Sequence, residues 1–121
     1  MKWIDKEIAR ERQRLERARR RFVRAPSEEC LHDVRTTGRR LRSLLEDVGD
    51  LISHPKLRRR VKRAAAVTDA ALDAAVLRAL VEASVDVAEA GAAAPLLEQL
   101  REHERQATEL ACRRLERVSF R

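Results

Sequence analysis

The sequence predicts an all-α fold, an antiparallel four-helix bundle with long helices. Only three glycines and three prolines interrupt the 121 residues, which argues against a β-rich fold. The apolar residues are mostly Ala, Leu and Val, and they recur at three- and four-residue spacing, which is typical of one face of a helix. Short turns separate the four amphipathic segments. The length suits one small domain, residues 1–121.

The first helix is expected from about Trp3 to Arg24. Its apolar stripe consists of Ile4, Ile8, Leu15, Ala18 and Phe22. A neighbouring face carries a basic stripe of Arg10, Arg14, Arg17 and Arg21. Glutamates 7, 11 and 16 lie at i,i+3 and i,i+4 spacing from several of these arginines and offset part of the charge. The stripe alone is equally consistent with a solvated surface and with a binding surface.

The second helix is expected from Ser27 to Ile52, because Pro26 suits a first turn and acidic residues 28 and 29 favour a helix N-terminus. Within it, four cationic or titratable side chains fall on one face within about 80° of arc at about 100° per residue. They are His32, Arg35, Arg39 and Arg42. Apolar positions 34, 41, 45 and 48 fall on another face. The sequence shows no matching carboxylates for this row of cations, so it predicts a polyanionic partner.

The third helix is expected from Lys56 to Glu89, after a short turn at residues 53–55. One apolar stripe runs along it, made of Leu57, Val61, Ala64, Ala65, Thr68, Leu72, Ala75, Val76, Ala79 and Ala83. Its first turns carry Arg58, Arg59, Arg60, Lys62 and Arg63. Cations at a helix N-terminus oppose the macrodipole, which strengthens the case for an anionic partner at this end.

The fourth helix is expected from Pro95 to Phe120, with Gly91 as the C-cap of the helix before it. The side chains expected to face inward are Leu97, Leu100, Ala107, Ala111, Leu115 and Val118. An acidic outer stripe consists of Glu98, Glu102, Glu109 and Glu116. The opposite flank carries His103, Arg114, Arg117 and Arg121.

Charge is distributed unevenly along the chain. Residues 1–63 hold 20 basic and 10 acidic residues, a net charge of +10, whereas residues 64–121 hold 7 and 10, a net charge of −3. Of the 27 basic residues, 23 are arginine, whose rigid fork of donors suits phosphate oxygens.

The chain contains no glycine-rich phosphate loop, no His-Glu-x-x-His and no Cys-x-x-Cys. Cys30 and Cys112 are far apart in sequence and are expected to be reduced thiols. No leader-like or membrane-spanning apolar run is evident, so a cytoplasmic location is expected. His32, His54 and His103 lack the carboxylates of a metal site, which disfavours a metal-dependent phosphohydrolase. We therefore expect no metal, no cofactor and no catalysis.

The run from His32 to Arg42 resembles the signature of the CHAD domain, the conserved histidine α-helical domain. Members of that family carry a similar His-x-x-Arg-x-x-x-Arg-Arg-Leu-Arg helix after a first helix with spaced arginines, and residues 110–120 resemble the family's final helix. Two features depart from the family pattern. Thr68-Asp69 and Leu72-Asp73 stand where an Arg-Asp pair is usual, and the length matches one of the family's two four-helix halves.

The resemblance implies binding of inorganic polyphosphate in a basic groove or central cavity, where phosphate or sulfate ions could also be held, and it implies no catalysis. It also implies association with polyphosphate granules. The residues that carry over by position are His32, Arg35, Arg39, Arg40 and Arg42. Basic positions on the other helices join the expected site, namely Arg10, Arg14, Arg17, Arg21, Arg59, Lys62, Arg63, Arg114 and Arg117.

The alternative function is binding of a nucleic-acid backbone. Against it, the basic face has no interleaved aromatic residues to stack on bases, and no helix-turn-helix pattern is evident. A membrane partner is not expected. A homodimer is expected, because pairing of two copies would recreate the two halves that the family usually carries in one chain.

Overall fold

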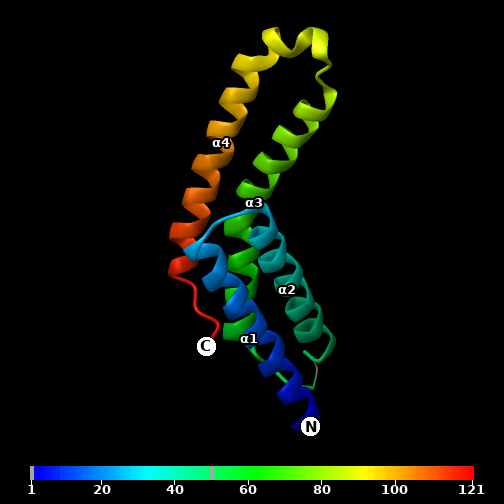
Figure 1. Cartoon of the computed structure of the whole chain (residues 1–121). Helices are drawn as coiled ribbons and strands as arrows, with labels where there is room; N and C mark the ends of the chain where they lie inside the picture. The colour runs from blue at the N-terminus through cyan, green and yellow to red at the C-terminus, as the bar shows by residue number, and fades with distance from the viewer. Residues whose placement is uncertain (1, 50) are drawn as a thin grey trace.

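The computed structural model describes residues 2–49 and 51–121, and all regular structure in that part of the chain is helical (Figure 1). The elements are α1 (Lys2–Arg24), α2 (Glu28–Asp47), α3 (Pro55–Ser84), the short 3-10 helix η1 (Val87–Glu89) and α4 (Ala90–Glu116). Consecutive α-helices run in opposite directions (Figure 1). The prediction of an all-α antiparallel helical bundle is confirmed.

The start of α2 is fixed by a side-chain cap. Ser27 has an extended backbone, and its hydroxyl oxygen accepts a hydrogen bond from the backbone N–H of Cys30 at 3.0 Å. This contact satisfies one of the backbone donors that a helix leaves unpaired at its N-terminus. The predicted start at Ser27 is therefore correct to within one residue.

The predicted end of this helix at Ile52 was wrong, because α2 ends at Asp47. The chain then turns at Val48, whose carbonyl accepts a hydrogen bond from the Ile52 N–H at 2.8 Å. Apolar residues continue through this turn, so periodicity alone extended the predicted helix across it. The chain must reverse direction here, before Pro55 opens α3.

The connection between α3 and α4 differs from the prediction at three places. The third helix ends at Ser84 rather than Glu89, and Asp86 caps η1 by accepting the Glu89 N–H at 3.0 Å. Gly91 is not a C-cap and Pro95 is not a helix start, because both lie inside α4. The four alanines between residues 90 and 94 favour a helix that begins before Pro95, since alanine is the strongest helix former.

The last helix ends at Glu116 rather than Phe120, and the residues beyond it form a tail packed on the core. Val118 and Phe120 are buried in this tail. The buried carboxylate of Glu16 accepts the Phe120 N–H at 3.0 Å, and the Arg19 guanidinium donates to the Leu115 carbonyl at 2.9 Å. The tail is thus tied to α1 by a buried polar contact rather than by continued helix.

The core lies where the four α-helices pack together, and we call this part the body (residues 2–49, 51–74 and 107–121). Its largest fully buried side chains include Leu15, Phe22, Leu41, Leu45, Leu115 and Phe120. Beyond it, the rest of α3 and α4 with η1 forms a two-helix projection, here called the arm (residues 75–106) (Figure 1). No described residue of the arm is buried. The four helices therefore do not pack along their whole lengths, because α1 and α2 lie alongside only the first part of α3.

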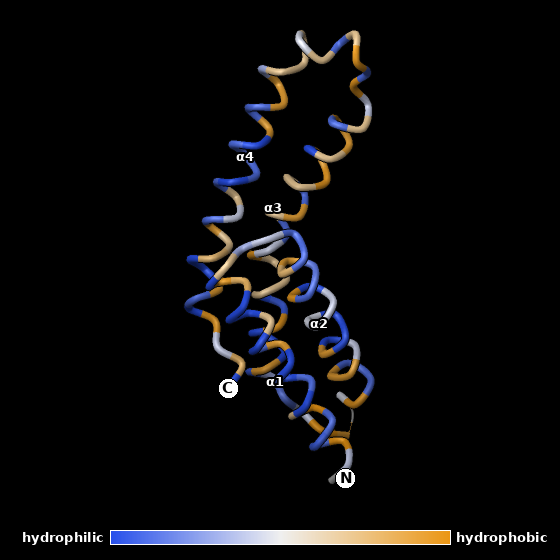
Figure 2. Tube along the Cα trace, viewed as in Figure 1, coloured by the Kyte–Doolittle hydropathy of each residue, from blue (hydrophilic) through white to orange (hydrophobic). Residues whose placement is uncertain are grey.

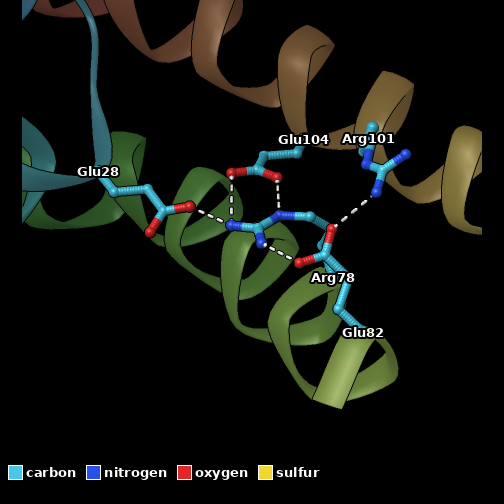
Figure 3. A network of polar contacts seen from close by, with 5 residues as sticks. All are labelled: Glu28, Arg78, Glu82, Arg101 and Glu104. Carbon is cyan, nitrogen blue, oxygen red and sulfur yellow. Dashed lines mark hydrogen bonds and ion pairs between the residues drawn. The ribbon is translucent and has the colours of Figure 1, made fainter. Parts of the chain in front are cut away.

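One guanidinium joins the arm to the body (Figure 3). Arg78 donates to Glu104 on α4 at 2.6 Å and to Glu82 on α3 at 2.9 Å, and it also pairs with Glu28 at the start of α2. Arg101 adds a contact to Glu82 at 3.1 Å. The hydrogen bond to Glu104 raises the pKa of Arg78 above its ordinary value. This network places a half-buried charge at the junction without leaving it unpaired.

Replacing Gly38 with alanine should stabilise the protein by about 0.5–1 kcal/mol, because alanine is the better helix former. A methyl group at this position would meet only the Leu15 side chain, at an ordinary contact distance of 3.9 Å. The measurement is urea unfolding followed by circular dichroism. A loss of stability on Gly38→Ala would mean that α1 and α2 approach more closely than the structure shows.

Candidate functional site

A groove between α2 and α3 collects most of the basic face that the sequence singled out on α2. It has a volume of about 290 Å³. The residues that line it are Val34, Arg35, Gly38, Arg39 and Arg42 on α2, and Val61, Ala64, Ala65, Thr68 and Asp69 on α3. Most of the other lining residues are small or apolar, and the three guanidiniums all come from α2. Such a groove suits a narrow anion that needs several donors.

Arg35 is held in place from the α3 side. Its Nη1 donates to the Asp69 carboxylate at 2.7 Å, to the Thr68 hydroxyl at 2.9 Å and to the Ala65 carbonyl at 3.2 Å. A guanidinium has five N–H donors, and the donors on Nε and Nη2 make no hydrogen bond to any described residue. Arg35 is therefore fixed at one nitrogen and retains donors for a ligand, which lowers the ordering cost of binding.

The other two guanidiniums of the groove are exposed. Arg39 makes no ion pair within the described part of the chain. Arg42 pairs with Glu46 on the same helix at 3.1 Å, with both side chains about half exposed. Exposed pairs of this kind contribute little to stability, so a phosphate could displace Glu46 at small cost.

The expectation that this row of cations lacks carboxylate partners was wrong for two members. Asp69 neutralises Arg35, and Glu46 neutralises Arg42. Asp69 lies on a different helix, and its pairing depends on how α2 and α3 pack. The Thr68-Asp69 pair, which stands where the family usually has Arg-Asp, thus serves as the acceptor set that positions Arg35.

Only some of the predicted cations of α3 project toward this groove. At about 100° per residue, Arg58 and Lys62 lie within about 20° of Asp69 on the helix, although neither is among the residues that line the groove. Arg59 and Arg63 project about 80° and 120° away from Asp69, on a side of α3 turned from the groove. Lys62 is one of the predicted site residues, whereas Arg58 is not. Their shared register with Asp69 was the available signal.

His32 lies one turn from Arg35, but it lines a different hollow. Its neighbours there include Leu31, Leu72, Ala75 and Val76, and its Nε2 is 3.4 Å from the Thr36 hydroxyl. The structure therefore places the imidazole at the end of the α2–α3 interface and not among the guanidiniums of the groove.

The basic stripe of α1 does not reach the groove, contrary to the expectation of one shared site. Arg10 pairs with Glu7 at 3.2 Å, and Arg14 pairs with Glu11 at 2.6 Å. The Nη1 atom of Arg21 lies 3.7 Å from the Oδ2 atom of Asp33 on α2. The i,i+3 offsets expected from the sequence are therefore present for Arg10 and Arg14.

Arg17 lines a separate hollow beside the C-terminal tail, with Arg12, Arg20 and Arg121. Arg12 and Arg20 are not among the predicted site residues, because only the folded tail brings them near Arg121. Arg40, Arg114 and Arg117 are exposed and do not line the α2–α3 groove. The predicted set of cations is thus divided among several surfaces.

Two further features concern metal ions and membranes, in the described part of the chain. It contains no group of three or more His, Cys, Asp or Glu side chains placed to hold a metal ion. None of its helices combines the length and the apolar character needed to cross a lipid bilayer.

The family model for the CHAD domain matches residues 6–121, nearly the whole chain. The chain belongs to the CHAD family. That family is linked to polyphosphate, and the signature residues of this CHAD domain from His32 to Arg42 lie on α2. No curated protein and no solved structure matches this CHAD domain.

Proposed function

We propose that this CHAD domain binds inorganic polyphosphate along the α2–α3 groove. The observation that carries the proposal is how the three guanidiniums of the groove are paired. Arg35 is anchored with donors to spare, Arg39 is unpaired among the described residues, and Arg42 has only an exposed partner. Arg58 and Lys62 share the helical register of Asp69 on α3 and are exposed. Charge-assisted hydrogen bonds from these cations and from the groove guanidiniums to successive phosphate units would add along the polymer.

Binding is proposed without chemistry on the ligand. The groove contains one hydroxyl, that of Thr68, which is buried and donates to the carbonyl of Ala64 at 2.9 Å or of Ala65 at 3.0 Å. Its one carboxylate, Asp69, is held by Arg35. Both groups accept hydrogen bonds from Arg35, so the proposal gives them the role of positioning this guanidinium.

A nucleic-acid backbone is the alternative ligand, and the shape of the groove argues against a duplex. A volume of about 290 Å³ suits a bare phosphate chain, while a duplex would contact only the rims. No aromatic residue lines the groove to stack on a base. Neutralisation of phosphates would release counterions with either ligand, so salt dependence alone does not separate them.

The test is a competition experiment at fixed ionic strength. Labelled polyphosphate bound to the protein is displaced with unlabelled polyphosphate, duplex DNA or single-stranded DNA at equal phosphate concentration. We expect polyphosphate to compete at least about 10-fold better than either DNA, which corresponds to about 1.4 kcal/mol. Equal competition by duplex DNA would favour the nucleic-acid alternative.

A further inference from the structure

A second hollow collects cations between α1 and the C-terminal tail. Hydrophilic residues recur along α1, where Figure 2 draws them in blue, and several arginines among them meet the tail. The hollow has a volume of about 380 Å³ and is lined by Arg12, Gln13, Glu16, Arg17, Arg20, Phe120 and Arg121. Among these residues the guanidiniums outnumber the carboxylate of Glu16, and a terminal carboxylate on Arg121 would still leave them in excess. The hollow is therefore cationic.

The carboxylate of Glu16 is already neutralised from within the protein. It is buried, and it accepts hydrogen bonds from Arg19 at 2.7 Å and from the Phe120 N–H at 3.0 Å. Arg20 donates to it through Nε at 3.2 Å, and no described residue accepts a hydrogen bond from Nη1 or Nη2 of Arg20. Arg20 is therefore anchored much as Arg35 is in the groove, and it keeps donors for a ligand.

Two other guanidiniums of the hollow have no carboxylate partner in the described part of the chain. Arg12 is half-buried and Arg17 is exposed, while the ion pairs of α1 involve other arginines. Arg17 also lies one turn from Arg20, and like charges at that spacing on a helix repel each other. A bound anion would relieve this repulsion, so the hollow favours an anionic ligand.

The hollow and the groove lie on opposite faces of the body. Arg21 of α1 approaches Asp33 of α2, which marks the sides on which these two helices meet. At about 100° per residue, Glu16 lies about 140° from Arg21 around α1. Around α2, the groove residue Arg42 lies about 180° from Asp33. The two sites are therefore on the sides that α1 and α2 turn away from each other, and Figure 1 shows α1 between α2 and the C-terminal tail.

We propose that this hollow is a second binding site for phosphoryl groups, through which one chain links two segments of polyphosphate. The linking rests on the function proposed for the groove, because it needs a segment held at each site. Guanidiniums donate paired hydrogen bonds to phosphoryl oxygens, so the same ligand chemistry suits both sites. Sites that face apart cannot be filled by adjacent units of one short chain, so each holds its own segment.

The first test uses tripolyphosphate, which is too short to reach from one site to the other, and follows backbone amides by NMR. The amides of Phe120 and Arg121 report on the hollow, and that of Gly38 reports on the groove. We expect all three to shift in wild type. The hollow variant, Arg12→Ala with Arg17→Ala, breaks no ion pair among the described residues. It should raise the dissociation constant read from the tail amides at least about 10-fold, and that read from Gly38 by no more than about 3-fold.

Two further variants separate this inference from the function proposed for the groove. The groove variant, Arg35→Ala with Arg39→Ala, should do the reverse and weaken only the response of the Gly38 amide. The charge control, Arg59→Ala with Arg63→Ala, removes the same net charge and should leave both responses within about 3-fold of wild type. Tail amides that do not respond in wild type, or that respond equally in the hollow variant, would overturn the second site. A silent Gly38 amide would overturn the groove alone.

The linking is tested by light scattering with long-chain polyphosphate at fixed salt. Wild type and the charge control should form large assemblies with the polymer. The hollow variant and the groove variant should each bind the polymer without assembling, because one site holds only one segment. Equal scattering by either of these variants would overturn the linking. Assembly of the protein alone, abolished in the hollow variant, would assign the hollow to an acidic surface of a second copy instead.

Discussion

Replacing Arg35 and Arg39 together with alanine should weaken polyphosphate binding by about 100-fold, from about 1.4 kcal/mol lost at each guanidinium. Arg35 loses its anchored donors, and Arg39 is the one groove guanidinium that no described carboxylate neutralises. Both are helical positions away from the core, so helicity should persist. The measurement is fluorescence anisotropy with labelled polyphosphate at fixed salt.

The matched control is the double variant Arg59→Ala and Arg63→Ala, which removes the same net charge from cations turned away from the groove. We expect it to weaken binding by no more than about 3-fold, the effect of general electrostatic attraction. Equal losses in the two double variants would show that net charge, and not the groove, determines affinity.

A change of opposite sign gives a second control. Asp69→Asn removes the carboxylate 2.7 Å from Arg35 while keeping an acceptor of the same shape. The groove gains one unit of positive charge, so binding should strengthen by about 3- to 10-fold, within the range of one charge-assisted contact. Weaker binding in Asp69→Asn would show that the anchoring of Arg35 matters more than the charge of the groove.

Replacing Glu16 with glutamine should lower the free energy of unfolding by about 2–3 kcal/mol. The Glu16 carboxylate is buried and accepts from Arg19 at 2.9 and 2.7 Å, from Arg20 at 3.2 Å and from the Phe120 N–H at 3.0 Å. Without the negative charge, Arg19 loses its ion pair and keeps the Leu115 carbonyl as an acceptor, and the Phe120 N–H loses a charged acceptor. The measurement is urea unfolding at pH 7.

The same carboxylate gives a pH dependence of known sign. Burial alone would raise the pKa of Glu16, but hydrogen bonds from Arg19 and Phe120, with the charges of Arg19 and Arg20, bring it below its ordinary value of 4.5. The unfolded chain therefore binds this proton more readily than the folded protein does. The stabilisation is present above pH 4.5 and is lost as pH falls through the lowered folded-state pKa.

Wild type should lose stability more steeply than Glu16→Gln as pH falls below about 4.5, and the two should converge in acid. Glu7→Gln is the control, because Glu7 pairs with Arg10 on the same helix while substantially exposed. Its effect should stay below about 0.5 kcal/mol at every pH. Parallel pH profiles for wild type and Glu16→Gln would show that Glu16 is not the linked group.

The basic face of α2 could be predicted because its members share one helix. The spacing of Arg35, Arg39 and Arg42 places them together whatever the rest of the chain does, and all three line the groove. The anchor of Arg35 could not be predicted in the same way. Asp69 lies 34 residues further along, and its approach depends on the relative position of α2 and α3.

The sequence by itself determined the four helices, their apolar stripes and the cationic face that marks the CHAD family, since each depends on residues a few positions apart. Only the tertiary structure decided which stripes are covered. Val61 and Val76 belong to one predicted stripe of α3, yet Val61 is 1% exposed and Val76 is 49% exposed. Periodicity indicates a helix face, whereas burial and ion pairing depend on which distant segment packs on that face. Only the first turn of α2 lies beside Val76, across a hollow, so the valine stays half exposed.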